Sequence, residues 1–178
     1  MVYIPVTELN ATAWITPEPL PFEKRFSGKK KSIVIGQKWG NLWDCAWFHF
    51  TGEVPQSIRG RKVVLLIDVN GEVCVVDEQG CPIRGLTNVS STFDRTLGDP
   101  GKKVVQFNER AKGGEKIDIW ADAGNNDLFG KYKNNGTLEQ AHVAICNEEM
   151  RGLYYDFEVL YELMINLPGD KARYHSII

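Results

Sequence analysis

The side chains that could do chemistry are few and scattered along the chain. His49, His142 and His175 lie far apart in the sequence, and none of them has the spacing of a metal-ligand pair. The sequence contains no GxSxG nucleophile motif, and the glycine-rich segment AKGGEK lacks the serine or threonine of a phosphate-binding loop. We therefore expect this chain to contain no catalytic residue and no metal ligand.

Acidic side chains and cysteines offer little more. Glycoside hydrolysis needs two carboxyl groups that converge across a cleft. Four acidic residues instead surround one predicted hairpin, where we expect them to be solvated: Asp68, Glu72, Asp77 and Glu78. The cysteines show no CxxC spacing and are expected to be free thiols: Cys45, Cys74, Cys81 and Cys146.

Two tryptophans are candidates for a ligand-binding surface. Trp39 and Trp43 lie in the segment GQKWGNLWD, which is typical of a loop. An exposed aromatic ring can stack on the apolar face of a sugar ring. We predict Trp39 and Trp43 as carbohydrate-binding residues, with core packing as the alternative; for Trp47 and Trp120 we expect core packing.

Charge and composition exclude several classes of partner. The 178 residues carry 21 basic and 23 acidic side chains, for a net charge of -2. This balance predicts no nucleic-acid partner and no membrane partner, and the basic run of Lys29, Lys30 and Lys31 is expected to be a solvated loop. The N-terminus lacks the pattern of a signal peptide, and we expect a cytoplasmic location.

Short strand-like runs separated by Gly, Asn and Asp occupy most of the chain. Strands are predicted at residues 32–35, 46–54, 62–69, 72–76, 81–83, 89–93, 103–107, 116–121 and 137–146. Asn70-Gly71 predicts a type I′ hairpin turn, which needs positive φ at both central residues. The pattern favours a mainly β fold, an antiparallel β-sandwich.

Both ends of the chain differ from this pattern. Residues 1–31 are predicted to be irregular because they contain Pro17, Pro19 and Pro21. Aromatic and aliphatic side chains are expected to pin this segment onto a sheet: Trp14, Leu20, Phe22 and Phe26. Residues 1–147 are thus expected to form the β-sandwich domain with an irregular N-terminal segment.

The C-terminal segment, residues 148–178, is expected to be helical. Leu153, Phe157 and Leu160 begin an apolar face that continues to Leu167, and a second apolar row lies beside it. We expect one face to pack on the sandwich and the other to contact a partner; a helix buried entirely in its own domain is the alternative. The predicted domain-interface residues are Tyr154, Tyr161, Ile165, Ile177 and Ile178.

Five strings in a fixed order carry a resemblance to a known family. They are GNLWDCAWFHFTGEVP, IRGRKVVLLID, NGEVCVVDEQGCPIRGLT, IDIWADAGNNDLFG and MRGLYYDFEVLYELMINLP. Within them a turn from Glu78 to Gly85, a Phe129-Gly130 pair and a YYDFEVL helix match the family pattern. Over roughly residues 35–167 the chain resembles the N-terminal domain of glycoside hydrolase family 38 α-mannosidases of the cytosolic and bacterial branch.

The resemblance implies a galactose-binding-like jelly roll followed by a C-terminal amphipathic α-helix that leads into a catalytic domain. It implies a parent enzyme that hydrolyses terminal α-mannosides in oligosaccharide catabolism with a divalent metal, usually zinc. By the same resemblance, the ligands of that metal and the nucleophile would lie in the catalytic domain. The family's His-x-Asp motif is absent here, so no catalytic or metal residue is carried over to this chain. The chain is then expected to be a non-catalytic fragment.

Other functions fit the same residues. A stand-alone carbohydrate-binding module and a free-standing protein-interaction sandwich are the alternatives. The partners expected from these hypotheses are the catalytic domain of the same polypeptide, a second copy of the chain and a carbohydrate.

Overall fold

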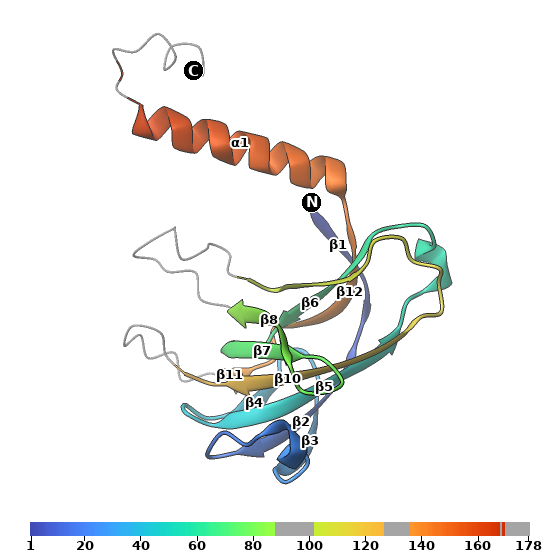
Figure 1. The fold of residues 1–178 in the computed structure, drawn as a ribbon, viewed down its shortest axis with the longest axis vertical. Helices are drawn as coiled ribbons and strands as arrows, with labels where there is room; N and C mark the ends of the chain where they lie inside the picture. The colour runs from blue at the N-terminus through green and yellow to red at the C-terminus, as the bar shows by residue number, and fades with distance from the viewer. Residues whose placement is uncertain (88–101, 127–135, 168, 170–178) are drawn as a thin grey trace. The chain divides into compact units, whose positions relative to one another are not determined.

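The computed structural model describes residues 1–87, 102–126, 136–167 and 169 (Figure 1). The strands are β1 (Tyr3–Glu8), β2 (Asn10–Thr16), β3 (Lys29–Ile33), β4 (Lys38–Gly40), β5 (Cys45–Glu53), β6 (Val63–Asp68), β7 (Glu72–Val76), β8 (Pro82–Thr87), β9 (Val104–Asn108), β10 (Lys116–Gly124), β11 (Gly136–Thr137) and β12 (Gln140–Cys146). The helices are η1 (Phe22–Lys24), η2 (Gln56–Ile58) and α1 (Glu148–Asn166). The predicted strand at 89–93 and the Phe129-Gly130 pair lie outside the described residues.

The strands form two main sheets. One has six strands in the order β3-β2-β5-β10-β7-β8, and the other has four in the order β1-β12-β6-β9. From β5 onward the chain crosses between these sheets repeatedly, at β5 to β6, β6 to β7, β8 to β9 and β9 to β10 (Figure 1). The predicted mainly β, antiparallel sandwich is confirmed.

A hydrophobic core fills the space between the sheets. Phe48 and Phe50 of β5 stack on each other with ring centroids 5.5 Å apart, and both are fully buried. All six residues of β6 are buried, so this strand is covered on both faces. The continuous apolar run VVLLID is the signal of such a strand, and its prediction as a central strand is confirmed.

The prediction that Asn70-Gly71 forms a type I′ hairpin turn is wrong. The turn does not close a hairpin, because β6 and β7 belong to different sheets. Asn70 has a φ of 55°, but Gly71 is not among the positive-φ glycines, so the turn is not type I′. Gly71 is needed for a close approach instead, since a Cβ there would lie 2.4 Å from the carbonyl oxygen of Gly124. The turn carries the chain from one sheet to the other.

The hairpin in this region is the next one along the chain. β7 and β8 pair antiparallel, and Gly80 in the turn between them has a φ of 83°. The Asp77 carboxylate accepts hydrogen bonds from the backbone N–H groups of Gln79 and Cys81 at 2.9 and 2.8 Å. β8 is the edge strand of its sheet, as predicted, but it extends to Thr87.

The prediction that residues 1–31 are irregular is also wrong. β1 and β2 occupy its first half, and β2 lies between β3 and β5. β2 was hard to recognise because its core-facing residues include Ala11 and Ala13, which carry little apolar signal. The basic run is likewise not a loop, since Lys29, Lys30 and Lys31 all lie in β3.

The segment between β2 and β3 crosses the outer face of the six-stranded sheet. We call residues 17–26 the aromatic strap. Trp47 donates a hydrogen bond from Nε1 to the carbonyl oxygen of Leu20 at 2.8 Å. Phe22 packs edge-on against Trp47, and Phe26 packs edge-on against Trp14 and Trp120. The prediction that aromatic side chains pin this segment onto a sheet is confirmed.

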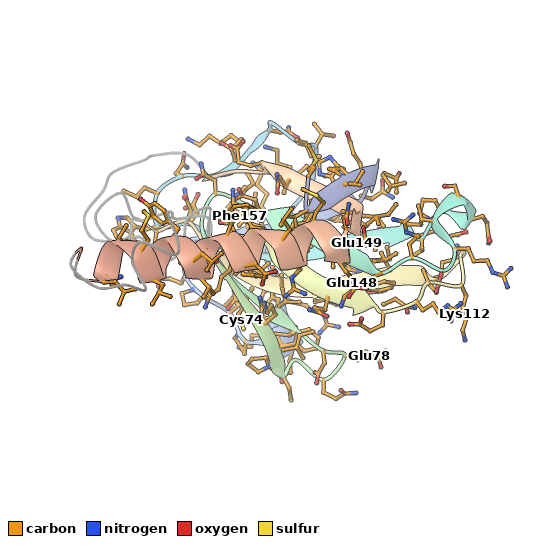
Figure 2. All side chains as sticks on the ribbon, turned by 90° about the horizontal axis from the view of Figure 1, so that it is seen from above. Cys74, Glu78, Lys112, Glu148, Glu149 and Phe157 are labelled. Carbon is orange, nitrogen blue, oxygen red and sulfur yellow. The ribbon has the colours of Figure 1, made fainter. Side chains whose placement is uncertain are left out.

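The predicted helix is present as α1. The side chain of Asn147 caps it by accepting a hydrogen bond from the Met150 N–H at 3.2 Å. Glu148 and Glu149 lie in the first turn, where their negative charges interact favourably with the positive end of the helix dipole (Figure 2). The chain divides into two compact units, one of residues 5–145 and one that joins residues 1–4 to residues 146–178.

Candidate functional site

The two tryptophans predicted to bind carbohydrate differ sharply in exposure. Trp39 is only 3% exposed, so its prediction as an exposed platform is wrong. It lies in β4, donates a hydrogen bond from Nε1 to the Val69 carbonyl oxygen at 2.8 Å, and packs edge-on against Phe48 at 5.3 Å. Core packing, the alternative for Trp39, is what the structure shows.

Trp43 is 63% exposed. It has a φ of 70°, and its backbone N–H donates to the Asn125 carbonyl oxygen at 2.7 Å, which holds the loop against the end of β10. The structure therefore leaves one of the two predicted rings available to a ligand. Trp47 and Trp120 were expected to pack in the core, but they pack beneath the aromatic strap and not between the sheets.

The predicted interface residues on α1 are exposed. Tyr154, Tyr161 and Ile165 are each about half exposed, and no residue of α1 is buried. Ten apolar side chains of this helix have exposed fractions between 36 and 64%: Met150, Leu153, Tyr154, Tyr155, Phe157, Val159, Leu160, Tyr161, Leu163 and Ile165. Ile177 and Ile178 lie outside the described residues.

The described histidines and acids do not converge. His49 is on β5, where its Nε2 lies 2.8 Å from Asp118 and its ring stacks on Trp120 at 4.3 Å. His142 is on β12 in the other sheet. Asp68 is buried and paired with Lys103 at 2.7 Å. In the described ranges no three His, Cys, Asp or Glu side chains are grouped to hold a metal, so these residues do not fit the family's metal centre.

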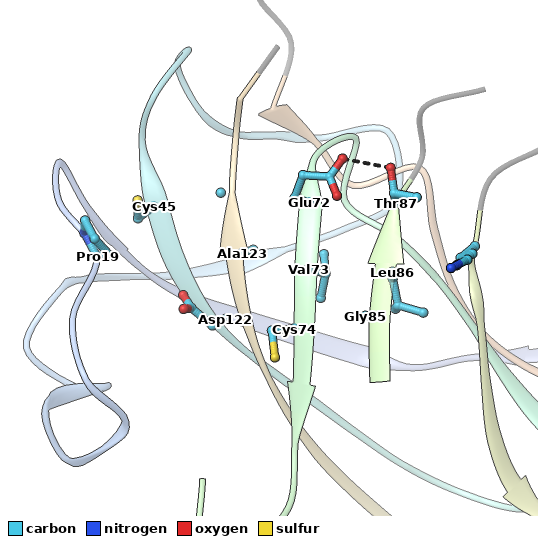
Figure 3. Close-up of a pocket in the computed structure, with 12 residues that line it drawn as sticks. Pro19, Cys45, Glu72, Val73, Cys74, Gly85, Leu86, Thr87, Asp122 and Ala123 are labelled. Carbon is cyan, nitrogen blue, oxygen red and sulfur yellow. Dashed lines mark hydrogen bonds between the residues drawn. The ribbon is translucent and has the colours of Figure 1, made fainter. Parts of the chain in front are cut away.

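A groove lies on the outer face of the six-stranded sheet (Figure 3). Its volume is about 470 Å³. Cys45, Asp122 and Cys74 lie in its floor on the neighbouring strands β5, β10 and β7, with Asp122 directly paired to Cys74. Pro19 of the aromatic strap forms one wall.

The far wall of this groove comes from the edge of the sheet. The Glu72 carboxylate accepts a hydrogen bond from the Thr87 hydroxyl at 2.7 Å, as Figure 3 shows. Lys102 bridges to Thr87 through paired backbone hydrogen bonds of 2.8 and 2.9 Å and also lines the groove. The groove thus offers carboxylate acceptors and one ammonium group around a floor of thiols.

Partial burial raises the pKa values of three groups in the floor of the groove. It raises the pKa of the Asp122 carboxyl above its ordinary value. The pKa values of the Cys45 and Cys74 thiols are raised as well, first by burial and then by the nearby charge of Asp122. Because the thiolate is the reactive form of cysteine, a raised pKa lowers the reactive fraction of both thiols. The groove offers groups suited to hydrogen bonding.

Sequence reasoning missed this groove. Cys45, Cys74 and Asp122 are far apart in the chain, and only strand pairing brings them together. A signal was present in the alternation of β10, where Asp118, Trp120 and Asp122 share the face opposite the core residues Ala121 and Ala123. That alternation shows which residues face outward but not which strands lie beside them.

Within the residues that the structure describes, no helix combines the length and apolar character that a membrane span needs.

Known proteins match most of this chain. A family model described as alpha-mannosidase, jelly roll domain, matches residues 4–163. Alpha-mannosidase 2C1 of Mus musculus is 25% identical over 175 residues, a match that covers 93% of this chain and 16% of that protein. Alpha-mannosidase 2C1 of Homo sapiens is 24% identical, covering 95% of this chain and 16% of the relative.

Alpha-mannosidase G of Dictyostelium discoideum is also 24% identical, over 88% of this chain and 14% of its own length. The chain therefore spans about a sixth of the length of these relatives: 16, 16 and 14%. The repeated crossing between two antiparallel sheets agrees with the family description. On the two observations together, the chain belongs to the family of alpha-mannosidase jelly roll domains.

Proposed function

We propose that this chain is a non-catalytic jelly-roll domain of a larger, metal-dependent α-mannosidase that hydrolyses terminal α-mannosides in oligosaccharide catabolism. The relatives named alpha-mannosidase support this, because each is several times longer than the matched region. Residues 1–147 would form the sandwich domain, and residues 148–178 would lead into the catalytic domain. We place the protein in the cytoplasm.

The observation that carries the docking role is the exposed apolar surface of α1. Exposed aromatic and aliphatic side chains in such number mark an interaction surface. The partner we propose is the catalytic domain of the same polypeptide, with Tyr154, Tyr161 and Ile165 buried against it. Zinc or another divalent metal would be bound in that domain.

The test uses the full product of the gene, assayed on an aryl α-mannoside with zinc supplied. We expect hydrolysis, and we expect the double variant Tyr161→Ser, Ile165→Ser to unfold at a lower temperature and lose activity. The matched control is Glu158→Ser, Glu162→Ser on the polar residues of the same helix, which should change little. A full product that does not hydrolyse the substrate with metal present contradicts the proposal.

A carbohydrate contact is a second candidate, favoured by the 63% exposure of Trp43. Titration of the chain with methyl α-mannoside should quench tryptophan fluorescence, and Trp43→Ala should abolish the change. An unchanged spectrum at millimolar sugar would eliminate this candidate and leave the docking role intact.

A further inference from the structure

A second hollow, of about 450 Å³, lies at the β3 edge of the sandwich. It is lined by Ile15, Lys29, Lys31, Lys38, Trp39, Gly40, Asn41 and Asp44. We call it the lysine hollow, because three of these eight residues are lysines, from two strands. The chain as a whole is slightly acidic, with a net charge of -2, so this concentration of positive charge is local.

The alternation of β3 explains how lysines reach this position. Ile33 pairs with Ala11 and Lys31 pairs with Ala13, and both alanines belong to the core. Side chains two residues apart share a face of a strand, so Lys31 and Lys29 continue the line of Ile33. Ile33 is buried, Lys31 is half-buried and Lys29 is exposed. The core-facing side of β3 therefore ends in two lysines.

The third lysine, Lys38, lines the hollow from β4. Lys31 donates a hydrogen bond from Nζ to the Lys38 carbonyl oxygen at 2.7 Å, which fixes the ammonium group beside that strand. An ammonium group has three donors, so the others remain available to a ligand. The buried ring of Trp39 and the side chain of Ile15 give the hollow a rigid floor.

The positive charge of the lysine hollow is not balanced within the part of the chain that the structure describes. No ion pair joins Lys29, Lys31 or Lys38 to an acidic side chain there. Asp44 is the one carboxylate among the lining residues, and its Oδ2 accepts a hydrogen bond from the Asn41 N–H at 2.7 Å. Like charges held together repel, and a bound anion relieves that repulsion.

We infer that the lysine hollow binds the phosphate group of a small phosphorylated molecule. Three lysines that line one concave site suit a compact multivalent anion. The volume lies in the range of small-molecule sites. An extended polyanion such as a nucleic acid is disfavoured, since the 23 acidic side chains outnumber the 21 basic ones over the chain.

The experiment titrates the whole chain with inorganic pyrophosphate by isothermal calorimetry at low salt. We expect one saturable site whose affinity falls as salt rises. The double variant Lys31→Gln, Lys38→Gln should bind at least about tenfold more weakly, because two charge-assisted contacts are lost. Asp44→Asn, which removes the opposing charge and keeps an acceptor for Asn41, should bind more tightly.

A charge-matched control separates a site from general attraction. Lys24→Gln, Lys112→Gln removes the same charge from two exposed lysines that do not line the hollow. Equal weakening by this control, or no binding by the unmodified chain, overturns the inference. Circular dichroism of each variant checks that the fold is kept.

Two further titrations distinguish the sources of the phosphate. A hexose phosphate that binds more tightly than pyrophosphate, with the unphosphorylated hexose not binding, identifies a sugar phosphate as the ligand class. Equal affinity for the two phosphate compounds assigns the site to the phosphate group alone. Binding of the unphosphorylated hexose with the affinity of its phosphate contradicts the inference, because the lysines would then be unnecessary.

Discussion

The outer face of the six-stranded sheet has two ends with opposite character. At one end the aromatic strap covers Trp14, Trp47 and Trp120. At the other end no segment among the described residues covers the sheet in this way, and Asp122 and Cys74 line the groove. Trp120 and Asp122 are two residues apart on β10, so the change occurs within one strand. The difference between the two ends therefore comes from the aromatic strap, which is distant in the sequence, and not from β10 itself.

Substitutions at the two ends of this face should therefore have different effects on stability. Removing a side chain beneath the strap leaves a void or an unpaired group, while the same change in the groove removes atoms that already border solvent. Four experiments test this comparison, from the largest expected effect to the smallest.

The largest effect is expected from Trp120→Ala. The ring contacts Trp14, Phe26 and His49 at centroid distances of 5.3, 5.2 and 4.3 Å. Its loss should lower the free energy of unfolding by about 2–4 kcal/mol, measured by urea denaturation. Cys74→Ala in the groove is the control and should cost less than about 1 kcal/mol. Similar losses in both variants would show that the strap adds no packing.

Two glycines of one hairpin provide a matched pair. Gly80 has a φ of 83°, and a Cβ there would lie 2.7 Å from the ring of Phe22. Gly85 has no atom within 4 Å of such a Cβ. Gly80→Ala should destabilise the chain by about 1–3 kcal/mol, and Gly85→Ala should be neutral or stabilising by about 0.5 kcal/mol. The thermal midpoints of the two variants measure this, and a reversed order would disprove the close contact.

Arg25 tests the polar part of the strap. Its guanidinium group lies 3.9 Å from the Phe22 ring centroid and 4.9 Å from that of Trp120, and its Nη1 donates to the Phe22 carbonyl oxygen at 2.9 Å. Arg25→Ala should cost about 1–2 kcal/mol in urea denaturation. The exposed neighbour Lys24 is the control, and Lys24→Ala should have almost no effect. Equal effects would show that the stacked guanidinium adds nothing to stability.

Substitution of Asp122 is expected to have the smallest effect, and it should stabilise the folded chain where the other substitutions destabilise it. Burial raises the pKa of its carboxyl in the folded chain, so folding favours the protonated form. The contribution of Asp122 to the free energy of unfolding is favourable at pH values below the ordinary pKa of a carboxyl group. It is lost as the pH rises through the raised pKa of the folded chain. Asp122→Asn should therefore raise the thermal midpoint at pH 7 by roughly 1–3 °C and should give no gain near pH 3. A gain of the same size at both pH values would contradict this cause.

Much of the fold was predictable from local patterns. The run VVLLID indicated a strand buried on both faces, and β6 is one. The four- and three-residue steps from Leu153 onward indicated a helix, and α1 runs over Glu148–Asn166 with Asn147 as its cap. These predictions succeeded because the period of burial along a strand or helix is a property of consecutive residues.

The candidate sites could not be predicted in the same way. Asn70-Gly71 was expected to close a hairpin, yet it passes the chain between sheets, because β7 pairs with β10 and β8 and not with β6. Trp39 was expected to be exposed, yet β4 places it against Phe48. Both outcomes depend on segments that are remote in the sequence.

The sequence by itself therefore determined the helix and most strands from β5 onward, but not β1, β2 or β4. It also carried the ordered motifs that indicated the family. Only the tertiary structure decided which strands are neighbours, where the strap lies, and which side chains line the groove and the lysine hollow. The physical reason is that periodicity records how each segment divides its residues between apolar and polar surroundings. The identity of those surroundings is set by pairing and packing between residues far apart in the chain.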